Sequence, residues 1–302
     1  MNKQKKSNQK MKLAMLLLVV AATVGCIVFL YFLLRPNRWT VTQYASNADE
    51  QAMIYTITDQ KGHFVIVDGG LDADAEMVRQ MIAQHRDHVD AWIITHTHKD
   101  HVGAFNAIMD GTANDFQIDH IYTVDYNTER YKETAHDYDR FDVHETFERF
   151  AADLPQIEYL HENDELDLIG LHMKVLSAWD EKVDAMEEHL CNDGSMMFRI
   201  DGKKDSMLFC ADVQEEMEQY ILPTHEEDIQ TDYVQCGHHG NWGLSTDFYD
   251  RINPKAVFMD APAWLFDAEN EKFDGYRLKQ YFMDRGIEVY THEGAPHTVT
   301  LE

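Results

Sequence analysis

The densest group of metal-binding side chains in the chain lies in residues 95–104, THTHKDHVGA. His96, His98 and His101 supply three imidazoles within six positions, and Asp100 adds a carboxylate between them. Imidazole and carboxylate groups are common protein ligands of zinc and related divalent ions. A histidine-rich surface loop that binds nothing is the alternative, because the chain has 17 histidines in all. The position directly after an apolar strand favours the metal site, since a motif takes its meaning from its structural context.

A strand and a helix are needed to bring these side chains together. Residues 89–95, VDAWIIT, predict a buried strand, and residues 101–110, HVGAFNAIMD, predict a helix. If the chain stays extended through the motif, His96 and His98 point to the same side. Asp100 and His101 then face the same space from the start of the helix. Gly103 allows another stretch of backbone to approach the helix closely.

The rest of residues 39–302 alternates strands and helices, except for a run of successive strands in the middle. The apolar patterns predict a helix at 72–85 and one long polar helix that stops near Pro155. They predict further strands at 63–70, 120–126, 166–178, 195–200, 205–213, 232–240 and 255–262, with two short strands at the C-terminal end. No repeat or Pro/Gly/Ser-rich linker divides residues 39–302. The sequence therefore predicts one α/β domain with two mixed sheets between outer helices.

The N-terminal part has a different composition. Residues 13–34 form 22 consecutive positions without a charge, enough to span about one bilayer core. Five lysines precede this segment and two arginines follow it, which favours a cytoplasmic N-terminus. A cleaved signal peptide and a lipoprotein signal at Cys26 are the alternatives, but the apolar run is long for the first and continues past Cys26. We expect a single-pass cell-membrane protein with a basic cytoplasmic tail (1–12), a transmembrane helix (13–34), a juxtamembrane segment (35–45) and an extracytoplasmic domain (46–302).

The charge distribution limits the partners of that domain. The first 38 residues hold seven of the 26 basic side chains and no acidic one, which leaves 19 basic and 54 acidic side chains, a formal charge of −35, on residues 39–302. Such a body repels polyanions at long range. This counts against an extended nucleic-acid surface, which needs a basic footprint. It favours a small-molecule or cell-envelope substrate.

Three cysteines lie outside the apolar N-terminal segment. An odd number cannot pair completely within one chain, so no disulfide framework is expected. Cys210 and Cys236 lie in apolar strands and are expected to be small buried hydrophobic residues. Cys191 instead lies among candidate metal ligands.

The motif at residues 96–101 resembles the HxHxDH signature of the metallo-β-lactamase superfamily. Three further stretches resemble motifs of the same family: VIVDGG, which contains Asp68, MLFCADV, which contains Asp212, and VQCGHHGNWGLS, which contains His238 and His239. The resemblance covers nearly all of residues 40–302. It implies a four-layer αββα sandwich with the metal site at one edge of the two sheets, preceded here by one N-terminal transmembrane helix.

The His-His-Gly form and the stretch HLCNDGSMMFRI narrow the resemblance to the hydrolase domain of DNA-uptake competence proteins and to phosphorylcholine esterases. The resemblance implies that His96, His98 and one later residue hold a first ion. That later residue is either His189 or Asn192. Asp68 is expected to orient a loop of the site by hydrogen bonding rather than to bind metal.

The second ion would be held by Asp100, His101, a bridging Asp212 and one of the two neighbouring histidines. We favour His239 as the ligand because it directly precedes Gly240, as in the family's Gly-His-Gly. His238 would then face the substrate, or it would orient a ligand. Asp100 and His238 are the expected catalytic residues.

The resemblance implies two divalent ions, with Zn²⁺ favoured over Mn²⁺, that hold a hydroxide for attack on an ester. We therefore expect a membrane-anchored, extracytoplasmic hydrolase of phosphoesters, phosphodiesters above all. Hydrolysis of lactones, amides or other small esters is the alternative within the enzyme class. A non-catalytic surface-binding protein with a structural metal site is the alternative outside it. Trp179, Trp242 and Trp264 lie in loop-like stretches and would either wall a substrate pocket or pack in the core.

Overall fold

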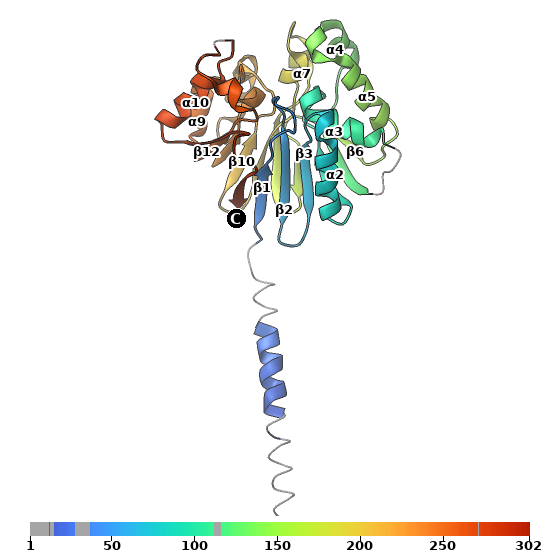
Figure 1. Ribbon diagram of the computed structural model, residues 1–302, viewed down its shortest axis with the longest axis vertical. Coiled ribbons are helices and arrows are strands. Elements are labelled where there is room, and N and C mark those ends of the chain that lie inside the picture. Colours follow the sequence, from blue (N-terminus) through green and yellow to red (C-terminus); the bar gives the residue numbers. More distant parts are fainter. Residues whose placement is uncertain (1–11, 13–14, 28–36, 112–115, 271) are drawn as a thin grey trace, which may run out of the picture. The chain divides into compact units, whose positions relative to one another are not determined.

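The computed structural model describes residues 12, 15–27, 37–111, 116–270 and 272–302 (Figure 1). The chain divides into two units, Met1–Asn37 and Arg38–Glu302. In the first unit, residues 15–27 are helical and their large apolar side chains are exposed. Within the described part of the chain, no helix is both long and apolar enough to cross a membrane. Residues 13–14 and 28–34 of the predicted transmembrane helix lie outside the described residues, so that helix stays a prediction.

The first sheet of the second unit has seven strands in the order β14-β1-β2-β3-β4-β5-β6. Its first half is antiparallel, and from β3 to β6 the strands are parallel. The strands are β1 (Trp39–Gln43), β2 (Ile54–Asp59), β3 (Phe64–Asp68), β4 (His88–Ile93), β5 (Gln117–Val124), β6 (Ile157–Leu160) and β14 (His297–Leu301). The parallel arrangement matters for function because β3 and β4 end at the same edge of the sheet.

The second sheet also has seven strands, in the order β13-β12-β11-β10-β9-β8-β7. Neighbouring strands from β7 to β10 pair antiparallel, and those from β10 to β13 pair parallel. The strands are β7 (Glu165–Leu168), β8 (Leu171–Ser177), β9 (Met197–Asp201), β10 (Ser206–Phe209), β11 (Tyr233–Gln235), β12 (Ala256–Phe258) and β13 (Glu288–Tyr290). Here too, β10 and β11 end at one edge, and each is followed by a loop that carries a predicted site residue.

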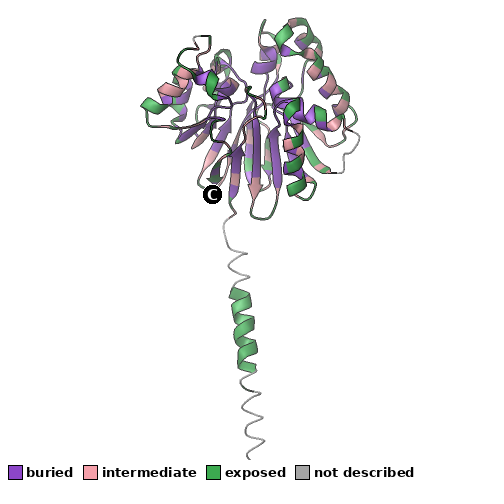
Figure 2. Ribbon diagram, in the orientation of Figure 1, coloured by how far each residue is buried: buried purple, intermediate pink, exposed green. Residues whose placement is uncertain are grey.

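Helices cover the outer faces of the two sheets. The first sheet is covered by α2 (Ala75–Gln84), α3 (Lys99–Met109) and α5 (Phe141–Ala151), and the second by α8 (Glu218–His225), α9 (Thr246–Ile252) and α10 (Gly275–Asp284) (Figure 1). Apolar residues of both sheets form a common core between them, as the buried inner strands in Figure 2 show. A second core lies under α2, α3 and α5 and includes Trp92, Phe105 and Phe147. The predicted α/β domain with two sheets between outer helices is confirmed.

Several predicted boundaries were wrong. The compact unit begins at Arg38 rather than at residue 46, because β1 pairs with both β2 and β14 and so belongs to the first sheet. The long polar helix is two helices, α4 (Thr128–Thr134) and α5, because Arg140 adopts the left-handed conformation directly before α5. The single strand expected at 166–178 is the β7–β8 hairpin, which turns at Ile169 and Gly170 with positive φ at both.

Candidate metal centre

The HxHxDH motif occupies the connection between β4 and α3. His98 is still extended, and the helix begins at the next residue. The ring centroids of His96 and His98 lie 4.8 Å apart, and those of His96 and His101 lie 4.0 Å apart. The expectation that the histidines face one space is therefore confirmed, although the helix starts two residues before its predicted start. His96 and His101 are fully buried, so their ring nitrogens must find partners inside the protein.

Two loops of the second sheet bring further ligand-type groups to the same place. Asp212 follows β10 and is almost completely buried. After β11 the chain forms a tight turn, Gly237–Gly240, rather than the predicted continuation of the strand, and both His238 and His239 have positive φ. A Cβ atom at Gly237 would lie 2.6 Å from the carbonyl oxygen of Val213, so only glycine fits where this turn crosses the Asp212 loop. The turn buries His239 fully and leaves His238 partly exposed.

Asp212 lies at the centre of the imidazoles. Its Oδ1 is 3.1 Å from His101 Nε2, and its Oδ2 is 3.5 Å from His239 Nε2 and 3.7 Å from His96 Nε2. His238 Nε2 is more distant, at 3.9 Å. A carboxylate with imidazoles on both oxygens has the arrangement that a residue bridging two cations requires. The bridging role itself stays a prediction.

Asp100 and His239 complete this side of the site. Asp100 Oδ2 lies 3.2 Å from His239 Nε2, and that nitrogen lies 3.2 Å from His101 Nε2. Two imidazole nitrogens this close need a proton or a cation between them. The ligand atoms of Asp100, His101 and His239 lie within 4.8 Å of one another, as do those of His96, His101 and Asp212.

The electrostatics of the site indicate a place for positive charge. Burial lowers the pKa of His239, but Asp212 and Asp100 raise it more, to about 9. Burial likewise opposes ionisation of Asp212, yet His101 and His239 hold its pKa well below the usual value. His96 Nε2 is buried without a hydrogen-bond partner, a costly state for a polar atom. A divalent cation would both satisfy this nitrogen and balance the carboxylates, so the residues fit a metal.

Two carboxylates support the imidazoles from behind. Asp68 accepts hydrogen bonds from the Thr95 backbone N–H and hydroxyl and from His101 Nδ1, each at 2.7 Å. Asp139 Oδ1 lies 3.1 Å from His98 Nε2. Metal-binding histidines usually hold their second nitrogen against a carboxylate in this way, which fixes the tautomer and the ring. The arrangement leaves His101 Nε2 and His98 Nδ1 for an ion, and it gives Asp68 the expected orienting position.

Sequence reasoning did not find Asp139. This residue lies in a short turn, Asp137–Asp139, 41 positions after His98, inside the stretch expected to be one polar helix. No local pattern distinguishes it from the many other acidic residues of the chain. Only the break between α4 and α5 brings it to the motif.

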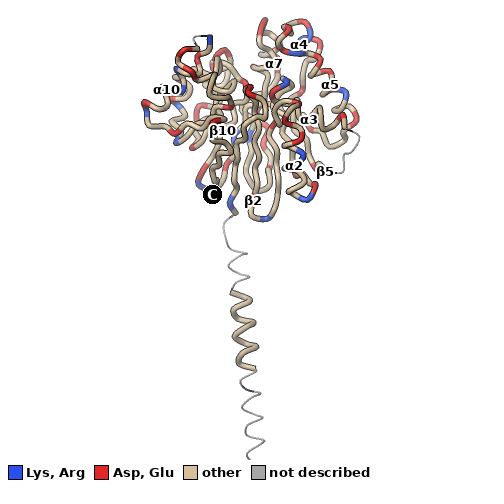
Figure 3. Tube along the Cα trace, viewed as in Figure 1, with Lys and Arg blue, Asp and Glu red and all other residues tan. Residues whose placement is uncertain are grey.

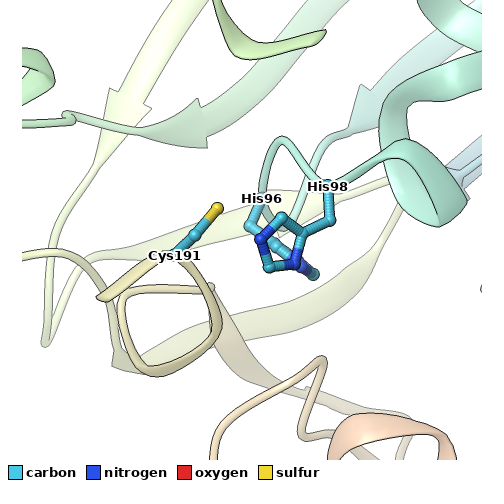
Figure 4. Close-up of side chains that lie close together, drawn as sticks. All are labelled: His96, His98 and Cys191. Carbon is cyan, nitrogen blue, oxygen red and sulfur yellow. The ribbon is translucent and has the colours of Figure 1, made fainter. Parts of the chain in front are cut away.

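The two candidates for the third ligand of the first ion lie in different environments. The side chain of His189 is 39% exposed, with Nε2 3.9 Å from a carboxylate oxygen of Glu188, and among the described residues no ligand-type group includes it. Asn192 is buried, and its Oδ1 has no hydrogen-bond partner. Between them, Cys191 is almost fully buried and forms a group with His96 and His98 (Figure 4). The role of His189 as a ligand stays a prediction.

A cavity of about 510 Å³ opens onto these residues. His98, Asp100, Asp212 and His238 reach it, and Tyr138, Trp242 and Phe273 form an aromatic part of its lining. Lys99 also lines it, but its Nζ is 2.8 Å from Glu50 Oε2. Of the three tryptophans singled out in the sequence, Trp242 is the one in this lining. Trp179 packs in the core, and Trp264 is partly exposed.

Comparisons with known proteins agree with the fold. Residues 48–173 match the family model described as Metallo-beta-lactamase superfamily. One similar solved structure is the metallo-β-lactamase fold protein YhfI from Bacillus subtilis, at 13% identity and a TM-score of 0.54, covering 87% of this chain and 99% of that chain. Another is CmlA, a diiron β-hydroxylase from Streptomyces venezuelae, at 14% identity and a TM-score of 0.55, covering 87% of this chain and 54% of that chain. At such identities the likeness to solved structures shows the fold alone. No curated protein sequence matches the chain.

Proposed function

We propose that this chain, which carries a metallo-β-lactamase superfamily domain, is a dinuclear-metal hydrolase of small phosphoesters. One observation carries the proposal: imidazoles from the β4–α3 segment and from the turn after β11 converge on Asp212, which follows β10 and lines a cavity. A structural metal site would be expected to close its coordination within the protein. Here the group opens onto a cavity large enough for a small substrate, which favours an enzyme.

The proposed ligands divide into two sets. Asp100, His101 and His239 would hold one ion, His96 and His98 with a further residue would hold the other, and Asp212 would bridge them. Bound divalent ions would make water a stronger nucleophile at neutral pH and polarise the ester bond. Zn²⁺ is favoured over Mn²⁺ because imidazole is the commonest ligand in the group.

The protein's own groups would orient the reactants. Asp100 Oδ2 accepts a hydrogen bond from Gln51 Nε2 at 3.3 Å, which holds the carboxylate at the cavity floor for a catalytic role. His238 lines the same cavity, with its Nδ1 3.4 Å from Gln214 Nε2. From that position its imidazole would pass a proton to the leaving oxygen of the substrate.

The cavity lining supports a small substrate with an apolar or planar portion. Tyr138, Trp242 and Phe273 offer aromatic surface, and Lys99, the one lysine or arginine among the described lining residues, already pairs with Glu50. The negative charge of a phosphoester would therefore rest against the metal ions. Acidic side chains are spread widely over the unit that begins at Arg38 (Figure 3), which disfavours a polyanionic substrate at long range.

We also propose that the domain is anchored at the outer face of the cell membrane. The 22 uncharged residues 13–34 and the five lysines before them support this part of the proposal. A cell-envelope ester or a small extracytoplasmic ester would then be within reach of the site.

The test is a hydrolysis assay with the full-length chain, purified in detergent, stripped of metal and reloaded with Zn²⁺ or Mn²⁺. The substrates are chromogenic phosphodiesters, phosphomonoesters, lactones and β-lactams. We expect metal-dependent turnover with phosphodiesters leading, and its loss in the metal-free protein. Turnover of lactones or β-lactams alone would refute the substrate class. A protein that binds two ions and hydrolyses no member of the panel would favour the non-catalytic alternative.

A further inference from the structure

Cys191 lies where a third ligand of the first ion is needed. It sits on the one-turn helix α7 (Leu190–Asp193), and Figure 4 shows its side chain extending towards the side on which His96 and His98 lie. The ligand atoms of these three residues lie within 4.8 Å of one another. Bonds of about 2.3 Å to sulfur and about 2.0 Å to nitrogen put the ligand atoms of a tetrahedral zinc site roughly 3.3–3.6 Å apart. A contraction of about 1 Å would therefore close the site around an ion.

The backbone favours Cys191 over His189. His189 has positive φ, at 60°, and its side chain is 39% exposed where it lines the cavity. The turn is fixed at both ends, because Asp193 N–H donates to His189 O at 3.0 Å and Met196 N–H donates to Thr95 O at 2.9 Å. The second bond ties the segment directly to the motif loop. Among the described residues, Cys191 forms a ligand-type group with His96 and His98, and His189 does not.

His96 and His98 each have a ring nitrogen that is available to bind the ion. His98 Nε2 is engaged by Asp139, which leaves Nδ1 for an ion. His96 Nε2 is buried without a hydrogen-bond partner. The Cys191 sulfur lies 3.8 Å from the Thr97 hydroxyl, too far for a strong hydrogen bond.

We propose that the Cys191 thiolate, with His96 and His98, binds the first metal ion. The inference rests on the proposed function, since it requires that the site hold divalent ions. It deepens that function by making the two metal sites chemically unequal. A thiolate favours Zn²⁺ over Mn²⁺ at the first site, whereas the second set contains only imidazole and carboxylate groups and accepts either ion. The alternative is that Cys191 only fills space as a small buried hydrophobic residue of the core.

The test is a Co²⁺ titration of the metal-free, full-length protein, followed by absorption spectroscopy. A cobalt–thiolate bond gives an intense charge-transfer band in the near ultraviolet, and sites of nitrogen and oxygen alone do not. We expect this band in the parent protein and its loss in Cys191→Ser. It should persist in His189→Ala, which removes one of the two candidates predicted from the sequence. It should also persist in Cys210→Ser, which makes the same chemical change at a buried cysteine elsewhere in the core.

A parent protein that binds Co²⁺ without this band would overturn the inference, and so would a band that survives in Cys191→Ser. If Cys191→Ser does not fold, X-ray absorption of the parent zinc protein gives the same information. The zinc shell should contain a sulfur neighbour at about 2.3 Å. A zinc shell of nitrogen and oxygen alone would refute Cys191 as a ligand, but it would not contradict the proposed hydrolase function. A parent that takes up no divalent ion would refute both.

Discussion

Replacing Asp68 by asparagine should weaken one metal site without disturbing the other. In the parent protein, Asp68 accepts three hydrogen bonds, and His101 Nδ1 provides one of them at 2.7 Å. An asparagine that keeps its oxygen against the Thr95 N–H presents an N–H group to His101. The imidazole then accepts at Nδ1, and its proton moves to Nε2. That nitrogen is the one that faces Asp212, so the proton occupies the position of the ion.

The expected size of the effect follows from the bond that is lost. A buried hydrogen bond to a charged group contributes about 1.5–3 kcal/mol. Loss of such a supporting carboxylate usually lowers metal affinity by about 10–100-fold, equivalent to roughly 1.4–2.7 kcal/mol, so the two estimates agree. We expect Asp68→Asn to raise the dissociation constant of one Zn²⁺ by this factor, with the other close to the parent value.

The assay is competition for Zn²⁺ against a chromophoric chelator, fitted to two sites. Asp232→Asn is the matched control, because Asp232 also accepts a backbone N–H, from Ser206 at 2.9 Å, but belongs to no group of potential metal ligands among the described residues. Asp139→Asn should instead weaken binding of the first ion, because Asp139 supports His98. Two unchanged constants in Asp68→Asn, or an equal loss at both sites, would refute the argument that Asp68 acts by fixing the tautomer of His101.

Three further predictions test the ligands, the fold and the topology. Asp212→Ala should lose metal and stability together, and His239→Ala should lose one ion. His238→Ala should keep both ions and lower turnover by about 10²–10⁴-fold. The metal content and the rate constant of each variant test this, and the reverse pattern for the two histidines would exchange their roles. Burial lowers the pKa of His144 to about 4, so the folded state binds fewer protons than the unfolded state between that pH and about 6.5, and stability should fall as the pH drops through this window. Chemical denaturation of His144→Gln and the parent at pH 7 and pH 4.5 should show the parent losing about 2 kcal/mol more than the variant, and equal losses would contradict this. Protease added outside intact cells should digest residues 39–302 and spare the lysine-rich end, and a protected body would argue against the proposed orientation.

Most of the fold and the central residues of the site could be predicted from the sequence alone. Strands and helices follow from the local period of apolar residues, which is why the α/β class and the two sheets could be predicted. The motif at residues 96–101 is local as well. The motif runs from the end of a strand into the start of a helix, and this short change of direction makes its side chains face one space.

The resemblance of MLFCADV and VQCGHHGNWGLS to family motifs added Asp212 and His239 before any contact was known. The structure then brought both to the motif, within hydrogen-bond or ion-pair distance of His101. Their predicted ligand roles await the metal measurements. The choice between His238 and His239 needed the turn itself, because neighbouring residues with positive φ do not follow strand alternation.

Tertiary structure decided the remaining parts. Asp139 supports His98 only because the chain breaks between α4 and α5 and returns to the motif, and an acidic chain offers no local sign of that return. Cys191 and His189 stand two positions apart, and the sequence permits either to face the ion. The one-turn helix α7 places the cysteine beside His96 and His98, whereas the histidine before the helix has positive φ and lines the cavity. Residue type and spacing thus define which groups are able to bind a metal, and the direction of each side chain depends on backbone bonds between segments far apart in the sequence.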